Sequence, residues 1–229
     1  MHQVNTSPVP DRSMRLIAGF GLLLMAILAA WANFGVIEGN VIDGDTLASA
    51  DNIVSNEGLF RAGILAFVII GLLDVTVAWA LNEVLKDKAR ALSSLAAVLR
   101  YVYGGILIVA SGFLLIAVHV ATGTSDISAV DLSELQLWLD AFAYIWDIGL
   151  MLFACHLIVL GVAIEKAKIA GVWVGLGWIV MIAGAGYLYD SVAVVMNWDI
   201  GFEFASVLFV GEVVLLVWLI YSGFREKLS

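Results

Sequence analysis

Residues 59–84 read LFRAGILAFVIIGLLDVTVAWALNEV, and only Arg61, Asp74 and Glu83 among them carry a charge. A helix needs about 20 mostly apolar residues to cross the hydrocarbon core of a bilayer, and this run exceeds that length. Its apolar residues are continuous and do not alternate with a period of two, as the strands of a transmembrane barrel do. The run therefore predicts a transmembrane helix.

Five further runs of the same kind lie on either side of it, and they cover residues 15–37, 94–120, 137–164, 171–197 and 203–224. The composition agrees, because 62% of the residues are hydrophobic, 14% are charged and the mean hydropathy is +1.03, whereas about a quarter of a soluble domain is charged. We predict an all-α, polytopic transmembrane bundle of six helices. It forms one domain over residues 14–229 and follows a flexible cytoplasmic tail over residues 1–13.

The connections between these runs differ in charge. Nine of the eleven Lys and Arg residues lie in the N-terminal segment, the second and fourth connections and the C-terminal tail, namely Arg12, Arg15, Lys86, Lys88, Arg90, Lys166, Lys168, Arg225 and Lys227. The other three connections are acidic. Because basic residues collect on the cytoplasmic side, both termini are predicted to be cytoplasmic. The net charge of −9 disfavours a nucleic-acid partner, which leaves the lipid bilayer as the predicted partner.

Ionisable residues inside the predicted helices are the most informative feature. A charge at the bilayer centre costs about 2.5–3.5 kcal/mol on the insertion scale, so each must face the bundle interior or water. A rise of about 1.5 Å per residue sorts them by depth. The inner group contains Asp74, Arg100 and His156, and the outer group contains Asp147, Asp190 and Glu212.

For the inner group we predict a buried ion pair between Arg100 and Asp74, whose depths differ by only about one helical turn. The alternative is that Arg100 extends to the cytoplasmic headgroups. His156 has no second histidine at its depth, so we interpret it as a hydrogen-bonded residue of the polar core and not as a haem or metal ligand. The sequence thus predicts no metal site and no cofactor.

For the outer group we predict a shared acidic site. Asp147, Asp190 and Glu212 come from three helices, and no Lys or Arg lies at their level. Three carboxylates in one apolar pocket cannot all stay charged, so the site is expected to hold a proton or attract a cation. Tyr144 and Tyr187 are candidate hydrogen-bond donors to it. The alternative is that each acid separately accepts hydrogen bonds from Ser, Tyr or backbone donors.

Four segments resemble the family catalogued as domain of unknown function 4386. They are Leu59-Phe60-Arg61-Ala62-Gly63-Ile64, Leu99-Arg100, Asp147-Ile148-Gly149-Leu150 followed by Phe153 and His156-Leu157, and Gly186-Tyr187-Leu188-Tyr189-Asp190-Ser191. The resemblance runs from about residue 15 to 222 and implies a bacterial protein of the cytoplasmic membrane, with no activity to carry over. One departure is Ala141-Phe142-Ala143, where the family resemblance leads us to expect His-Gly.

Two functions fit these residues. The first is a small carrier or proton/cation relay that uses the acidic outer group, since intramembrane charges mark ion pathways. The second is an accessory, regulatory or assembly subunit, whose buried charges pair structurally and whose partners are other membrane subunits or a second copy. An intramembrane enzyme is less favoured, because the sequence lacks a recognisable nucleophile–base or metal-ligand set.

Overall fold

The computed structural model describes residues 11–123, 128–171, 173–198 and 201–225, and all regular structure in these ranges is helical. In chain order the elements are α1 (Asp11–Ala30), the π-helix η1 (Trp31–Ile37), α2 (Glu38–Asn40), α3 (Thr46–Ser55), α4 (Glu57–Thr122), α5 (Ala129–Ala167), α6 (Leu176–Met196), α7 (Ala205–Leu208) and α8 (Val210–Arg225). The predicted all-α class is confirmed.

Within the described ranges, five stretches are long and apolar enough to cross a membrane, and one of them, α4, contains two of the six predicted helices. α4 folds back at Ala89, which has φ −144° and ψ 43°. Gly and Pro are the residues that disfavour a helix most strongly. The stretch from Leu85 to Ser93 contains neither of them, so helical geometry continues on both sides of Ala89. The two predicted helices are therefore joined by a single non-helical residue, where we expected a longer connection.

Helix boundaries differ from the predictions where polar residues extend an apolar run. α5 begins at Ala129, well before residue 137, because Ser128 and Asp131 form a capping box at its start. The first helix begins at Asp11, so residues 11–13 of the predicted tail are helical, while residues 1–10 lie outside the described residues. The last predicted helix is divided into α7 and α8 at Phe209.

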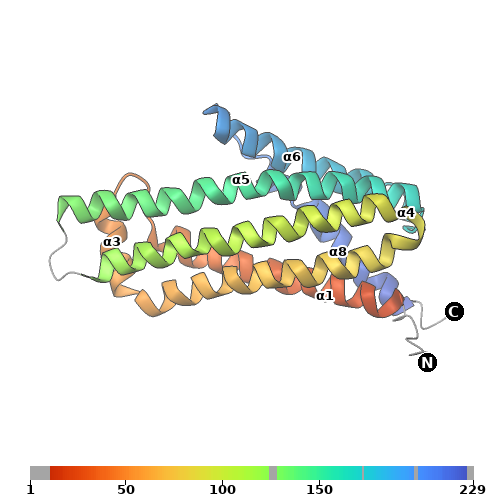
Figure 1. Ribbon diagram of the computed structural model, residues 1–229, viewed down its shortest axis with the longest axis horizontal. Coiled ribbons are helices and arrows are strands. Elements are labelled where there is room, and N and C mark those ends of the chain that lie inside the picture. Colours follow the sequence, from red (N-terminus) through yellow and green to blue (C-terminus); the bar gives the residue numbers. More distant parts are fainter. Residues whose placement is uncertain (1–10, 124–127, 172, 199–200, 226–229) are drawn as a thin grey trace, which may run out of the picture.

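The two halves of α4 and α5 run along one axis and α6 is inclined to it (Figure 1). The N-terminal end of α1 and the C-terminal end of α8 lie at the same end of the bundle (Figure 1). There Arg12 Nε donates a hydrogen bond to Gly223 O at 3.1 Å. Free ends of the first and last helices on the same side of the bundle agree with six crossings of the membrane. The prediction that this side faces the cytoplasm rests on the charge pattern alone. With 39 and 21 residues, α5 and α6 are about 58 and 32 Å long, so the N-terminal part of α5 extends past α6 (Figure 1).

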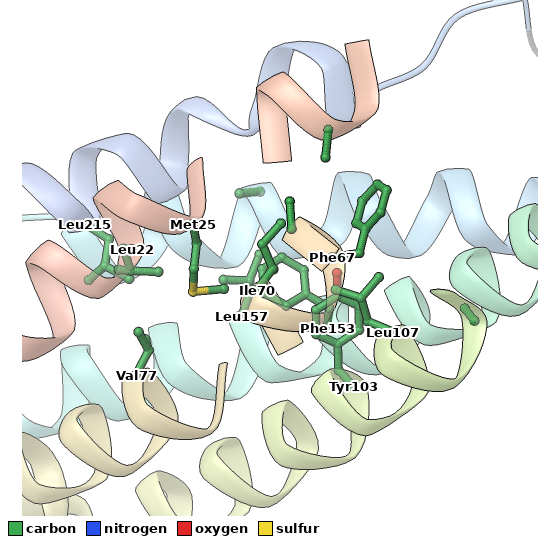
Figure 2. Close-up of a cluster of buried hydrophobic side chains, with 14 of the residues drawn as sticks. Leu22, Met25, Phe67, Ile70, Val77, Tyr103, Leu107, Phe153, Leu157 and Leu215 are labelled. Atoms are coloured by element: carbon green, nitrogen blue, oxygen red, sulfur yellow. The ribbon is translucent and has the colours of Figure 1, made fainter. Parts of the chain in front are cut away.

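Two glycines bring the halves of α4 together. A Cβ added at Gly104 would lie 2.8 Å from Gly71 O, and one added at Gly71 would lie 2.8 Å from Gly104 O. Such an approach is possible only without side chains at these positions. Around it, apolar side chains from α1, α4, α5 and α8 form the core, including Met25, Phe153 and Leu215 (Figure 2).

Candidate functional site in the buried polar core

An ion pair crosses the two halves of α4. Arg100 Nε donates to Asp74 Oδ1 at 2.7 Å, and the two side chains are 1% and 0% exposed. The reversal at Ala89 sets the two residues opposite each other, and the contact between Gly71 and Gly104 lies one helical turn away. The structure thus brings together the two residues for which the sequence predicted a buried pair.

His156 of α5 joins this pair from a third direction. Its Nδ1 lies 2.8 Å from Ala96 O and its Nε2 lies 3.2 Å from Arg100 Nη1. A carbonyl oxygen only accepts and a guanidinium only donates, so the proton is assigned to Nδ1 and the lone pair to Nε2. His156 is therefore neutral here, and it holds Arg100 without adding a charge to the core.

The rest of the guanidinium is surrounded by apolar and weakly polar groups. The Phe153 ring lies beneath it, with the Arg100 Cζ 5.3 Å from the ring centroid. Arg100 Nη2 lies 3.9 Å from the Met25 sulfur of α1, a weak acceptor. The second oxygen of the carboxylate, Asp74 Oδ2, is buried and has no hydrogen-bond partner among the described residues. The pair is thus enclosed but incompletely satisfied.

A second carboxyl group reaches this core from α8. Glu212 is half-buried, forms a hydrogen bond with the Tyr187 hydroxyl, and interacts electrostatically with both Arg100 and Asp74. Tyr187 of α6 packs edge-on against Phe153, with the ring centroids 5.5 Å apart. The Phe153 ring therefore touches both the guanidinium and the tyrosine that binds Glu212.

The other two predicted acids have different partners. Asp190 accepts hydrogen bonds from Phe204 N at 3.1 Å and Ala205 N at 2.6 Å, so it caps the start of α7. Asp147 is half-buried and interacts electrostatically with Glu203. In the described ranges no hydrogen bond joins any two of Asp147, Asp190 and Glu212.

The two tyrosines predicted as hydrogen-bond donors to the outer acids lie in different surroundings. Tyr144 is 60% exposed on the outer surface of α5, whereas Tyr187 is half-buried and bound to Glu212. The contacts place Glu212 and Tyr187 with the inner group, because α8 packs its start against the N-terminal half of α6, with Gly211 against Ile179 and Ala183. The level predicted for the three acids therefore did not bring them together.

Two residues that shape the site were given no role from the sequence, although Phe153 stands in one of the segments that resemble the family. Phe153 lies three residues before His156, on the same face of α5, and that spacing was the available signal. Met25 lies in an apolar run, where nothing distinguishes it from its neighbours. Within the described residues, His, Cys, Asp and Glu side chains form no group of three that could hold a metal ion.

The described residues form five apolar helical stretches, of which α4 folds back on itself, and these stretches enclose a charge network. This arrangement defines an all-α, multi-pass membrane protein. The chain belongs to the family described as "Domain of unknown function (DUF4386)", whose sequence profile matches residues 17–223. It is 31% identical over 166 residues to an uncharacterized protein of Archaeoglobus fulgidus, an alignment that covers 72% of this chain and 85% of that one. No solved structure matches the chain.

Proposed function

We propose that the protein is a small carrier or proton/cation relay, and that Glu212 with Tyr187 is its exchange site. One observation supports this most directly: Asp74 pairs with the single guanidinium of Arg100, and a second carboxyl group, Glu212, is bound to Tyr187, which contacts the same Phe153 ring as that guanidinium. His156 is neutral and adds no charge. With both acids ionised, the core would carry one uncompensated negative charge, which is costly in a membrane interior. A proton or a monovalent cation at Glu212 restores neutrality.

The burial of the two acids supports Glu212 as the exchanging group. Asp74 is 0% exposed and sealed against Arg100, whereas Glu212 is half-buried and is held by a hydroxyl that can donate a hydrogen bond. Asp147, half-buried and close to Glu203, offers a further acidic position for an ion on its path. Asp190 has a different role in this proposal, because backbone donors already occupy its carboxylate.

The location we propose is the cytoplasmic membrane of a bacterium. The family membership and the basic residues at one end of the bundle support this placement, with that end facing the cytoplasm.

The test is ion flux in proteoliposomes that hold a pH-sensitive dye and carry the full chain. An imposed pH or Na⁺/K⁺ gradient should produce a dye response that falls at least tenfold in Glu212→Gln and less in Tyr187→Phe. Glu134→Gln is the matched control, because Glu134 is an exposed acid near the start of α5 that accepts a hydrogen bond from Trp138 Nε1. A wild-type response no greater than that of empty liposomes, or one unchanged in Glu212→Gln, would refute the proposal.

The alternative, an accessory or assembly subunit, is favoured by a different observation. Asp74, Arg100 and His156 are each at most 1% exposed, as expected of charges that fix helix packing and need no access to ions. Native mass spectrometry of the protein purified from its membrane distinguishes the two functions. A stoichiometric second subunit, together with a silent flux assay, would favour the accessory function.

A further inference from the structure

Resting on the relay function proposed above, we further propose that Arg100 is a movable counter-ion. It pairs alternately with Asp74 and with Glu212, while one proton passes in the opposite sense between the two carboxyl groups. In the structure Arg100 is paired with Asp74, and to this state we assign the proton on Glu212.

The neighbours of Arg100 hold its guanidinium without competing for its charge. His156 Nε2 is an uncharged acceptor, and its orientation is fixed by the Nδ1 contact to Ala96 O. The Phe153 ring contacts both the guanidinium and, edge-on, the tyrosine that binds Glu212. A guanidinium can stay in cation–π contact with this ring as it turns from Asp74 towards Glu212.

Asp74 is prepared to receive the proton. Its Oδ1 accepts from Arg100 Nε, but its buried Oδ2 has no hydrogen-bond partner in the described structure. When Arg100 moves away, a bare carboxylate at this depth would be strongly disfavoured. Protonation of Asp74 removes that charge. In the exchange an O–H bond of Glu212 breaks and an O–H bond of Asp74 forms, so the total charge of the core stays the same.

The charged and titratable groups around Arg100 come from four elements. They are Asp74 and Tyr103 on α4, His156 on α5, Tyr187 on α6 and Glu212 on α8, while α1 contributes only the uncharged Met25. The two tyrosines bear no charge near neutral pH. The two carboxyl groups are therefore the only anionic partners available to Arg100 in this part of the structure.

The test compares thermal unfolding of the purified full chain in one detergent for wild type, Asp74→Asn, Glu212→Gln and the double variant. Each single variant leaves Arg100 one carboxylate, so each should lower Tm by only a few degrees. The double variant leaves Arg100 none, and its loss should exceed the sum of the single losses by about 5 °C. The control is the double variant Asp74→Asn with Asp147→Asn, because the charged group that acts on Asp147 is Glu203 and not Arg100. The Tm losses of its two single variants should add.

The opposite result would overturn the counter-ion proposal. If Asp74 is the sole partner, Asp74→Asn alone will be as unstable as the double variant, or will fail to fold, and Glu212→Gln will add nothing to it. This outcome is separable from failure of the relay function. If Glu212→Gln abolishes flux but the Tm losses of Asp74→Asn and Glu212→Gln simply add, the relay function stands and the movable arginine is rejected. If the double variant loses more than the sum but wild type shows no flux, the movable counter-ion stands and the relay function is rejected.

Discussion

Replacement of Gly104 by Ala should separate the two halves of α4 and weaken the polar core. In the structure a Cβ at this position would lie 2.8 Å from Gly71 O and 3.0 Å from Asp74 Cβ, whereas ordinary contacts begin at 3.4 Å. The backbone would have to move by about 0.6 Å, the difference between 3.4 and 2.8 Å, because the obstructing atom is a carbonyl oxygen and not the end of a flexible side chain. The shift would act directly on the helix that carries Asp74.

The magnitude has two opposing parts. Overpacking of a tight contact costs about 1–3 kcal/mol, whereas Gly→Ala in a helix contributes up to about 1 kcal/mol of stabilisation. Gly105 isolates the packing part, because it is the next residue of the same helix and a Cβ there meets nothing within 4 Å. Gly105→Ala should therefore be neutral or stabilising, and Gly104→Ala should be less stable than Gly105→Ala by about 1–3 kcal/mol.

Thermal unfolding of both variants in the same detergent measures this difference. For a chain of this size we expect Tm of Gly104→Ala to fall about 2–10 °C below that of Gly105→Ala. Gly112→Ala serves as a second open-position control. Equal midpoints for all three variants would show that the halves of α4 do not approach as closely as described, and the argument from Gly71 and Gly104 would fail.

The other predictions concern two side chains of the site. His156→Gln keeps an acceptor for Arg100, and His156→Asn keeps a donor for Ala96 O. Because hydrogen bonds to charged groups contribute about 1.5–3 kcal/mol and neutral ones less, Tm should fall in the order wild type, His156→Gln, His156→Asn, His156→Ala. An Asn variant as stable as the Gln variant would contradict this order. Asp190→Ala removes both acceptors at the start of α7 and should cost about 0.5–2 kcal/mol, with faster amide hydrogen exchange at Ala205; unchanged exchange there would show that the cap is dispensable.

The two groups of ionisable residues differ in how far their depth along the bundle places them. A rise of about 1.5 Å per residue places Asp74, Arg100 and His156 at one level, and the structure joins these three. The same rise per residue placed Asp147, Asp190 and Glu212 in one outer group. In the structure Gly211 packs against Ala183, about two helical turns before Asp190 on α6, and Asp190 faces the backbone of α7. Chain position gives only an approximate depth, and the packing of α8 on α6 decides both the level and the direction of Glu212.

Helix ends show a similar division. The capping box of Ser128 and Asp131 was readable in the sequence and would have placed the start of α5 correctly. The apolar run alone starts later, because hydropathy reports the part of a helix that lies in lipid and not the part that extends beyond it. The π-helix over Trp31–Ile37 had no comparable signal, since it depends on how the first helix packs against α4, where Val36 meets Gly63.

The sequence by itself determined the class of the protein, its number of apolar segments and the need to enclose its internal charges, because these follow from length, hydropathy and the cost of an ion in lipid. Only the tertiary structure decided which charges meet. The reversal at Ala89 and the contact between Gly71 and Gly104 set Asp74 against Arg100, and the packing of α8 on α6 brought Glu212 to Tyr187. Such contacts depend on side-chain volumes at helix interfaces, which a one-dimensional pattern of polarity does not contain.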